Sequence, residues 1–390
     1  MTTTMAVRRG PGDVVLTGAA VLSAFGRGMT ALADGLDAGA PAFRPVDRFD
    51  VTARRVGVAA AVPGSPALTD ELVRVVDEAC DEAKLSAAER SGAPLFLALH
   101  GDPALARVAE ADRRRHSSTA FTAALAATTG LATDLPLGAG IRAYTSACVA
   151  ASTAVADAAA AIARGELDRV VVAGGYLVDA DQFSLFDAGR ALSTDGQVRP
   201  FSEGRRGLLL GDGVGAVVVE SAAAARDRGV PALARLAGWG RAGDAYHPCQ
   251  PHPEGAGLAR AVTAALRRAG IGPEALGYVN AHGSGTAQSD VAEAAALRIA
   301  LGEHAATVPV SSTKSLHGQA LEASGVLELI VTLHALRTGR LPVNAGFLAA
   351  DEHCPLHLVL DGFTAATPSY ALTLNAAFGG ANTALLVGSA

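Results

Sequence analysis

Residues 150–165, AASTAVADAAAAIARG, have the composition of a helix but almost no polar face. A helix that is apolar nearly all round must be buried between other layers rather than lie on a surface. Runs rich in β-branched residues, such as RVVVAGG and GAVVVES, alternate along the chain with similar alanine-rich segments. This alternation is typical of α/β proteins. The sequence therefore predicts an α/β fold in which helices are sandwiched between sheets.

Two parts of the chain echo each other. SACVAASTAVADAAAAI is followed by the glycine-rich strand LLGDGVGAVVVE, and KSLHGQALEASGVLELIV is followed by AAFGGANTALLVG at a similar offset. Such internal similarity is typical of a duplicated unit. Because no proline- or serine-rich linker separates the two parts, we expect one compact unit. Its two halves are predicted at residues 1–230 and 231–390.

Charge and hydropathy exclude several functional classes. The net charge is −6 and the chain has no long basic run, so we expect no nucleic-acid partner. The N-terminal apolar run is interrupted at Thr17 and Gly18 and resembles a first strand more than a secretory signal. No apolar stretch reaches the roughly 18 residues that a membrane helix needs. We expect a soluble, cytoplasmic protein without a membrane partner.

The cysteines and lysines narrow the search for chemistry. The four cysteines, Cys80, Cys148, Cys249 and Cys354, are scattered without CxxC spacing, which predicts neither a metal site nor a disulfide framework. No cofactor is expected. Lys84 and Lys314 are the only lysines.

The first candidate site is YTSACVAASTAVA, where Cys148 follows small residues at the start of the alanine-rich helix. Free backbone N–H groups and the positive end of a helix favour thiolate over thiol, which would make Cys148 a nucleophile. A buried structural cysteine is the alternative.

The second candidate is YVNAHGSGTAQSDVAEAAAL. Here His282 follows a strand in a glycine-rich loop, where it could serve as a donor or general base. Glu293 lies in the next helix and could reach back to orient a cationic partner.

Two further stretches complete the set. SSTKSLHGQALEASG places Lys314 on a loop and His317 and Gln319 on a turn before a small-residue helix. NAAFGGANTALLV contains a glycine-rich turn whose main-chain N–H groups, around Phe378 and Gly379, could point together at one oxygen. Such a pair of donors forms an oxyanion hole.

Taken together and in this order, these stretches resemble the β-ketoacyl synthase family, the condensing enzymes of fatty acid and polyketide assembly. VVLTGAAVLSAFG, RPFSEGRRGLLLGDGVGAVVVE and DAYHPCQPHPEGAG extend the resemblance over nearly the whole chain. It implies a thiolase fold, five layers α-β-α-β-α built from two duplicated halves, and a dimer.

The resemblance also implies roles for individual residues. Cys148 matches the acyl-accepting nucleophile, and His282 matches the first active-site histidine. Lys314 matches the neighbouring lysine, which Glu293 is expected to hold in place. The amides of Phe378 and Cys148 are expected to form the oxyanion hole.

Two positions depart from the family pattern. Gln319 stands where elongating members have a second histidine, and His317 lies two residues too early to replace it. Ala376 stands where the family has a bulky residue that gates the acyl pocket, so an open gate is expected. A glutamine amide donates a hydrogen bond as a histidine does, but it cannot shuttle a proton.

The resemblance implies decarboxylative condensation of an acyl group on Cys148 with a malonyl thioester. Specialised metabolism, such as polyketide or antibiotic biosynthesis, is favoured over housekeeping fatty acid biosynthesis. Gln319 leaves a second interpretation open, namely acyl transfer or cyclisation without decarboxylation. A chain-length-factor-like partner subunit is a third, although such subunits typically lack the nucleophile. The expected assembly is a homodimer or a heterodimer with another ketosynthase-like subunit.

The expected macromolecular partner is an acyl carrier protein, which is strongly acidic. A basic patch should therefore receive it. The candidates are Arg113, Arg114 and Arg115 in one stretch, and Arg205 with Arg206 in another.

Overall fold

The computed structural model describes residues 12–100, 140–361, 363–365 and 368–390. Most of its strands belong to one 12-stranded sheet made of two similar parts, which we call the first and the second sheet. The first part has the order β1-β8-β7-β5-β6 and the second has the order β9-β16-β15-β10-β11-β13. The strands of the first part are β1 (Val14–Ser23), β5 (Leu95–Leu99), β6 (Ile141–Tyr144), β7 (Arg169–Tyr176) and β8 (Gly213–Ser221). Those of the second are β9 (Ala234–Gly243), β10 (Leu276–Asn280), β11 (Pro309–Ser311), β13 (His357–Leu358), β15 (Tyr370–Ala377) and β16 (Ala381–Gly388).

The two parts have the same topology. In each part, the first strand along the chain (β1 or β9) pairs antiparallel with the last (β8 or β16). On its other side, that last strand pairs antiparallel with the strand before it in the chain (β7 or β15). The remaining strands continue parallel, as β7-β5-β6 and as β15-β10-β11. The parts join where β1 and β9 run antiparallel, with Val15 opposite Arg235 and Leu16 opposite Ala234. The duplication expected from the sequence echo is thus visible in the strand order.

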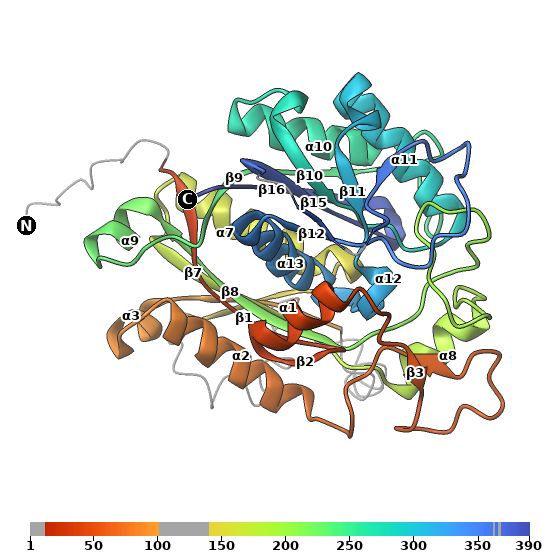
Figure 1. Ribbon diagram of the computed structural model, residues 1–390. Coiled ribbons are helices and arrows are strands. Elements are labelled where there is room, and N and C mark those ends of the chain that lie inside the picture. The colour runs from red at the N-terminus through yellow and green to blue at the C-terminus, as the bar shows by residue number, and fades with distance from the viewer. Residues whose placement is uncertain (1–11, 101–139, 362, 366–367) are drawn as a thin grey trace, which may run out of the picture.

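Helices form the layers around these two sheets, as Figure 1 shows. Helices α7 (Ala150–Ala163) and α13 (Ser324–Thr338) lie in the middle and contact strands of both parts. Helix α2 (Leu68–Glu82) covers the outer face of the first sheet, and α10 (Ala256–Ala269) covers that of the second beside α11 (Ala287–Leu301). The predicted α/β fold with helices between sheets, arranged α-β-α-β-α, is confirmed.

Small residues let the two central helices approach closely. A Cβ atom on Gly325 of α13 would lie 2.4 Å from the backbone nitrogen of Ser152 on α7. The Ser152 hydroxyl is buried and lies 2.7 Å from the Thr383 hydroxyl on β16. Nearly all of both helices is buried, which explains why their sequences lack a polar face.

Shorter elements complete the fold. They are β2 (Gly26–Arg27), α1 (Gly28–Ala38), β3 (Arg44–Pro45), β4 (Val58–Ala59), α3 (Ala87–Gly92), α8 (Ala180–Ala188), α9 (Ala222–Asp227), α12 (Lys314–His317), β12 (Arg340–Pro342) and β14 (Phe363–Ala365). Three-residue 3₁₀ turns matter for the site, namely η1 (Ala147–Val149), η4 (Leu321–Ala323) and η5 (Phe378–Gly380). Among the residues described, no helix combines the length and apolar character needed to span a bilayer.

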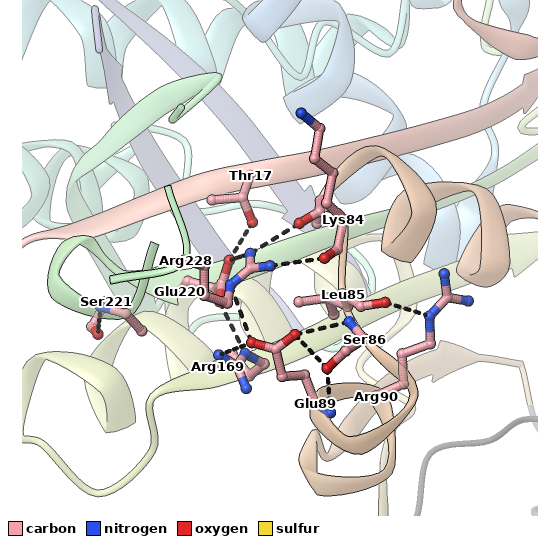
Figure 2. A network of polar contacts seen from close by, with 12 residues as sticks. Thr17, Lys84, Leu85, Ser86, Glu89, Arg90, Arg169, Glu220, Ser221 and Arg228 are labelled. Atoms are coloured by element: carbon pink, nitrogen blue, oxygen red, sulfur yellow. Dashed lines mark hydrogen bonds and ion pairs between the residues drawn. The ribbon is translucent and has the colours of Figure 1, made fainter. Parts of the chain in front are cut away.

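A buried charge network ties α2 and α3 to the first sheet (Figure 2). Glu220 of β8 is fully buried and accepts hydrogen bonds from Thr17, Arg169 and Arg228. The Arg228 guanidinium also donates to main-chain oxygens at the end of α2. Ser86 and Glu89 form a capping box that starts α3. A buried carboxylate with this many donors anchors the helices at a fixed position on the sheet.

Candidate active site

Cys148 lies in the 3₁₀ turn η1, between the end of β6 and the first residue of α7. The preceding Ala147 has a positive φ of 50°, a conformation that costs free energy for a residue with a side chain. This sharp turn sets Cys148 at the mouth of the buried helix. The residue is buried, with only 8% of its surface exposed, and η1 packs against β15 and η4.

His282 lies in the loop that follows β10, and Glu293 of α11 holds that loop. The main-chain N–H groups of His282 and Gly283 each donate to a different oxygen of the Glu293 carboxylate, both at 2.7 Å. Both His282 and Glu293 are buried. Burial raises the pKa of Glu293 to about 8. Glu293 therefore fixes the backbone at the histidine.

Lys314 begins α12 and is fully buried. Its Nζ donates to the main-chain oxygen of His282 at 2.7 Å and forms an ion pair with Glu328 of α13. The amide of Asn375 donates to the other oxygen of Glu328 at 2.6 Å. The carboxylate that holds Lys314 is thus Glu328, and the expectation that Glu293 has this role is wrong. Glu293 instead accepts hydrogen bonds from two backbone N–H groups, and among the described residues it forms no ion pair with Lys314.

Sequence reasoning missed Glu328 and Asn375. Glu328 stands alone in the apolar run SGVLELIV, and a carboxylate in a helix with no polar face requires a buried partner. That signal could have pointed to Lys314. Asn375 lies on β15, far from both in sequence, and nothing in its immediate neighbours indicates its partner.

His317 is turned into its own loop. Its Nε2 lies 2.9 Å from the Thr313 hydroxyl and its Nδ1 lies 2.9 Å from the Gly318 carbonyl oxygen. Burial lowers the pKa of His317 to about 3, which keeps the ring neutral. Both ring nitrogens are occupied within the turn, so this histidine is not free to act on a substrate.

Gln319 lies beside the Cys148 thiol. Its main-chain groups pair with Leu209 and Gly211, which fixes the position of the residue, and only 2% of its surface is exposed. Its side chain lies close enough to Cys148 to favour the thiolate. Within the described residues its Oε1 has no hydrogen-bond partner. The structure thus brings Cys148 and Gln319 together.

Electrostatics at Cys148 differ from the expectation. Burial, assisted by the negative charge of Glu322, raises the pKa of the thiol to about 12, although Gln319 and Lys314 act in the opposite direction. This direction is opposite to the one expected from the helix end, because desolvation outweighs it. Burial and the Lys314 charge also lower the pKa of His282 well below 6.5, so its imidazole is neutral.

The glycine-rich turn η5 follows β15, which packs against η1. Gly379 has a φ of 83°, and its N–H donates to the Pro248 carbonyl oxygen at 2.7 Å. Of the two amides expected around this turn, that of Gly379 is therefore engaged, which leaves the amide of Phe378 as the candidate donor. The Phe378 ring is 54% exposed and packs near Phe186 of α8. Ala376 is partly buried on β15.

The arginines expected to bind an acidic partner differ in how exposed their side chains are. Arg205 is buried in an ion pair with Asp351 at 2.6 Å and also donates to the Ser202 carbonyl oxygen, so it is not available for docking. Arg206 has a side chain that is 62% exposed. Arg113, Arg114 and Arg115 lie outside the described residues. No group of three or more histidine, cysteine, aspartate or glutamate side chains in the described part could hold a metal ion.

Comparisons with known proteins agree with this geometry. The family model "Beta-ketoacyl synthase, N-terminal domain" matches residues 69–225, and "Beta-ketoacyl synthase, C-terminal domain" matches residues 233–348. A Coxiella burnetii 3-oxoacyl-[acyl-carrier-protein] synthase 2 is 32% identical over 96% of this chain and 98% of its own length. A Staphylococcus aureus protein of the same name is 35% identical over 62% of this chain, and the match covers 61% of that relative's length.

A solved structure has the same fold. It is described as "The ishigamide ketosynthase/chain length factor" and superposes with a TM-score of 0.86. It is 28% identical and the superposition covers 98% of this chain and 100% of that one. The thiolase-type architecture of the two halves is therefore shared with a ketosynthase.

Proposed function

Because the chain belongs to the β-ketoacyl synthase family, we propose that it is an acyltransferase of the 3-oxoacyl-[acyl-carrier-protein] synthase type. It takes an acyl group from an acyl carrier protein onto Cys148 and then condenses it with a malonyl thioester. The observation that carries this proposal is the packing of η1, the turn that holds Cys148, against η4, which closely follows Gln319 in the chain. This packing supports a role for the Gln319 amide as a donor beside the nucleophile, where the family has a histidine.

In the first step the Cys148 sulfur attacks the thioester carbonyl carbon of the incoming acyl group. The oxygen becomes an oxyanion, for which the main-chain N–H groups of Cys148 and Phe378 are the proposed donors. The intermediate then expels the carrier thiolate, which takes up the proton released by Cys148. Since burial raises the pKa of that thiol, the proton must leave during the attack. The positive charge of Lys314 favours its departure.

In the second step the malonyl group loses carbon dioxide, and negative charge develops on its thioester oxygen. The neutral ring of His282 and the side-chain amide of Gln319 are the proposed donors to that oxygen. Each well-placed donor contributes on the order of 3 kcal/mol. The enolate carbon attacks the acyl carbon on Cys148, and the new intermediate expels the Cys148 thiolate. The product is a 3-oxoacyl chain on the carrier.

Lys314 supports both steps through its hydrogen bond to the His282 loop and through its charge. By donating to the His282 carbonyl oxygen it fixes the loop that carries the imidazole. Burial, assisted by the Lys314 charge, keeps that ring neutral. A neutral imidazole offers one N–H donor and one acceptor. Glu328 and Glu293 act as positioning residues, the first on Lys314 and the second on the backbone of His282 and Gly283.

Gln319 favours a second candidate function, acyl transfer without decarboxylation. An amide cannot accept and return a proton, so a site with a weakened enolate donor could instead pass the acyl group to an oxygen, nitrogen or sulfur nucleophile. A chain-length-factor-like role is less well supported, because this chain keeps Cys148, His282 and Lys314. A homodimer, or a heterodimer with a ketosynthase-like subunit, is compatible with each of these functions.

Release of labelled carbon dioxide separates the two enzymatic functions. The protein is loaded with an acyl group and given malonyl carrier protein labelled at the free carboxylate. We expect labelled carbon dioxide and a 3-oxoacyl product in equal amounts, and neither with a Cys148→Ala variant. Acyl transfer to another nucleophile without carbon dioxide release would instead establish the second function. We place the reaction in polyketide or other specialised biosynthesis, since Gln319 and Ala376 depart from elongating relatives.

A further inference from the structure

A second polar cluster lies next to Cys148, on the side of the first sheet. It consists of His100, Gln182 and Glu322, which come from three separate segments. His100 directly follows β5, Gln182 lies on α8 and Glu322 lies in η4. The turn η4 contacts η1, β5 and β7. This cluster joins His100 and Gln182 of the first half to Glu322 of the second, whereas His282, Lys314 and Glu328 all lie in the second half.

Hydrogen bonds fix the orientation of His100. The Gln182 amide lies 2.7 Å from His100 Nε2, and His100 Nδ1 lies 3.1 Å from Glu322 Oε1. When the amide N–H donates to Nε2, the ring proton must be on Nδ1 and is donated to the carboxylate. The hydrogen bond with Glu322 raises the pKa of His100. One oxygen of Glu322 is thereby satisfied and the side chain is held in place.

Within the described part of the chain, the other carboxylate oxygen of Glu322 has no such partner. Glu322 is 3% exposed, and Oε2 is buried without a hydrogen-bond partner among the described residues. An unsatisfied buried acceptor costs free energy, and more so when it is charged. The carboxylate is also near enough to Cys148 to raise the pKa of the thiol. A free acceptor beside a nucleophile, rigidly held by His100 and Gln182, has the features of a substrate contact.

The chemistry of the acceptor restricts its ligand. A carboxylate oxygen only accepts hydrogen bonds, so a saturated hydrocarbon chain offers it nothing. An acyl chain attached to Cys148 can therefore donate a hydrogen bond to Glu322 only if it carries a donor group near the thioester. Reduction of the keto group of a 3-oxoacyl chain yields a hydroxyl two carbons from the thioester carbon, which is such a donor.

We propose that Glu322 Oε2 accepts a hydrogen bond from the 3-hydroxyl group of an acyl chain on Cys148. The site then selects 3-hydroxyacyl thioesters over saturated ones. This specificity rests on the proposed function, since it requires that Cys148 is acylated. It also assigns the reaction that supplies the substrate, a ketoreduction of a 3-oxoacyl thioester.

The test compares two pantetheine thioesters of equal chain length, octanoyl and 3-hydroxyoctanoyl. The rate of Cys148 acylation by each is followed by intact-protein mass spectrometry. We expect the native protein to react at least about tenfold faster with the 3-hydroxy compound, as a hydrogen bond to a charged group predicts. A ratio near one in the native protein would overturn the proposal.

Variants assign the preference to Glu322. In Glu322→Ala we expect the ratio to fall to about one, while octanoyl acylation becomes faster because the negative charge beside the thiol is gone. Glu322→Gln keeps the shape of the side chain and replaces the alanine variant if that variant does not fold. It should lower the ratio by several fold. Glu303→Gln, at an exposed glutamate, should leave the ratio unchanged. A ratio retained in both Glu322 variants contradicts the proposal, whereas no adduct from either thioester contradicts the proposed function itself.

Discussion

The ammonium group of Lys314 donates to the main-chain oxygen of His282 at 2.7 Å and is itself held by the Glu328 carboxylate. Lys314 and Glu328 are both about 1% exposed. A buried charge is tolerated only when it is paired and hydrogen-bonded. The lysine therefore links the stability of the central helix layer to the position of the candidate catalytic histidine.

Removal of this lysine charge should destabilise the protein. In Lys314→Met the Glu328 carboxylate remains buried without its cation, and we expect a loss of about 3–5 kcal/mol in the free energy of unfolding. Urea denaturation measures this loss. Arg164→Ala removes one partner of the exposed pair between Arg164 and Glu166 and should cost less than about 1 kcal/mol. Equal losses in the two variants would contradict the structural role of Lys314.

Alkylation of Cys148 should depend steeply on pH. Burial raises the pKa of its thiol to about 12, and the thiolate is the reactive form. Between pH 7 and 10 the fraction of thiolate should therefore increase about tenfold for each pH unit. Iodoacetamide labelling of the Cys148 peptide, followed by mass spectrometry in a Cys249→Ser background, measures this. A rate that levels off below pH 9 would show that the native site lowers the thiol pKa.

Acylation should require Cys148 alone among the cysteines. After incubation with an acyl carrier protein we expect a covalent acyl adduct on the native protein and none on Cys148→Ala. Intact-protein mass spectrometry detects the added mass. Cys249→Ala, which changes the exposed cysteine, is the matched control and should keep the adduct. An adduct that persists in Cys148→Ala would remove this residue as the nucleophile.

Gln319 should contribute as a hydrogen-bond donor. In Gln319→Ala we expect carbon dioxide release from malonyl carrier protein to fall by about a hundredfold, the usual effect of deleting one such donor. Gln319→His restores a donor and should keep most of the rate. Acylation of Cys148 is measured in parallel as the control, since it precedes decarboxylation. An undiminished rate in the alanine variant would show that Gln319 does not stabilise the enolate.

Ala376 should determine how freely long acyl chains enter. Since a small side chain stands where the family has a bulky gate, Ala376→Phe is expected to slow acylation by long or rigid chains several-fold more than acylation by short ones. The ratio of acylation rates for dodecanoyl and butyryl carrier proteins measures this effect. An unchanged ratio would mean that this position does not control entry.

Several features of the molecule could be predicted from local sequence patterns. The apolar helix after Cys148, the alternation of strands and helices, and the echo between the halves all depend on residues close together in the chain. They predicted buried helices between sheets, which the structure has. The order of the motifs also indicated the family and predicted that Cys148 and Gln319 belong to one active site. The periodicity of apolar residues is sufficient here, because it indicates for each helix or strand whether one face or both faces are buried.

Partnerships across the fold could not be predicted in this way. Glu328 pairs with Lys314, whereas the sequence had pointed to Glu293 for this role. Likewise, burial of Cys148 reverses the effect expected from the helix end on its thiol.

Local sequence patterns therefore predicted the layers and the family. The folded arrangement was needed to establish which charges are paired, which thiol is desolvated and that His100 contacts Glu322. These depend on distances between segments far apart in the chain, and on how much water the packed layers exclude.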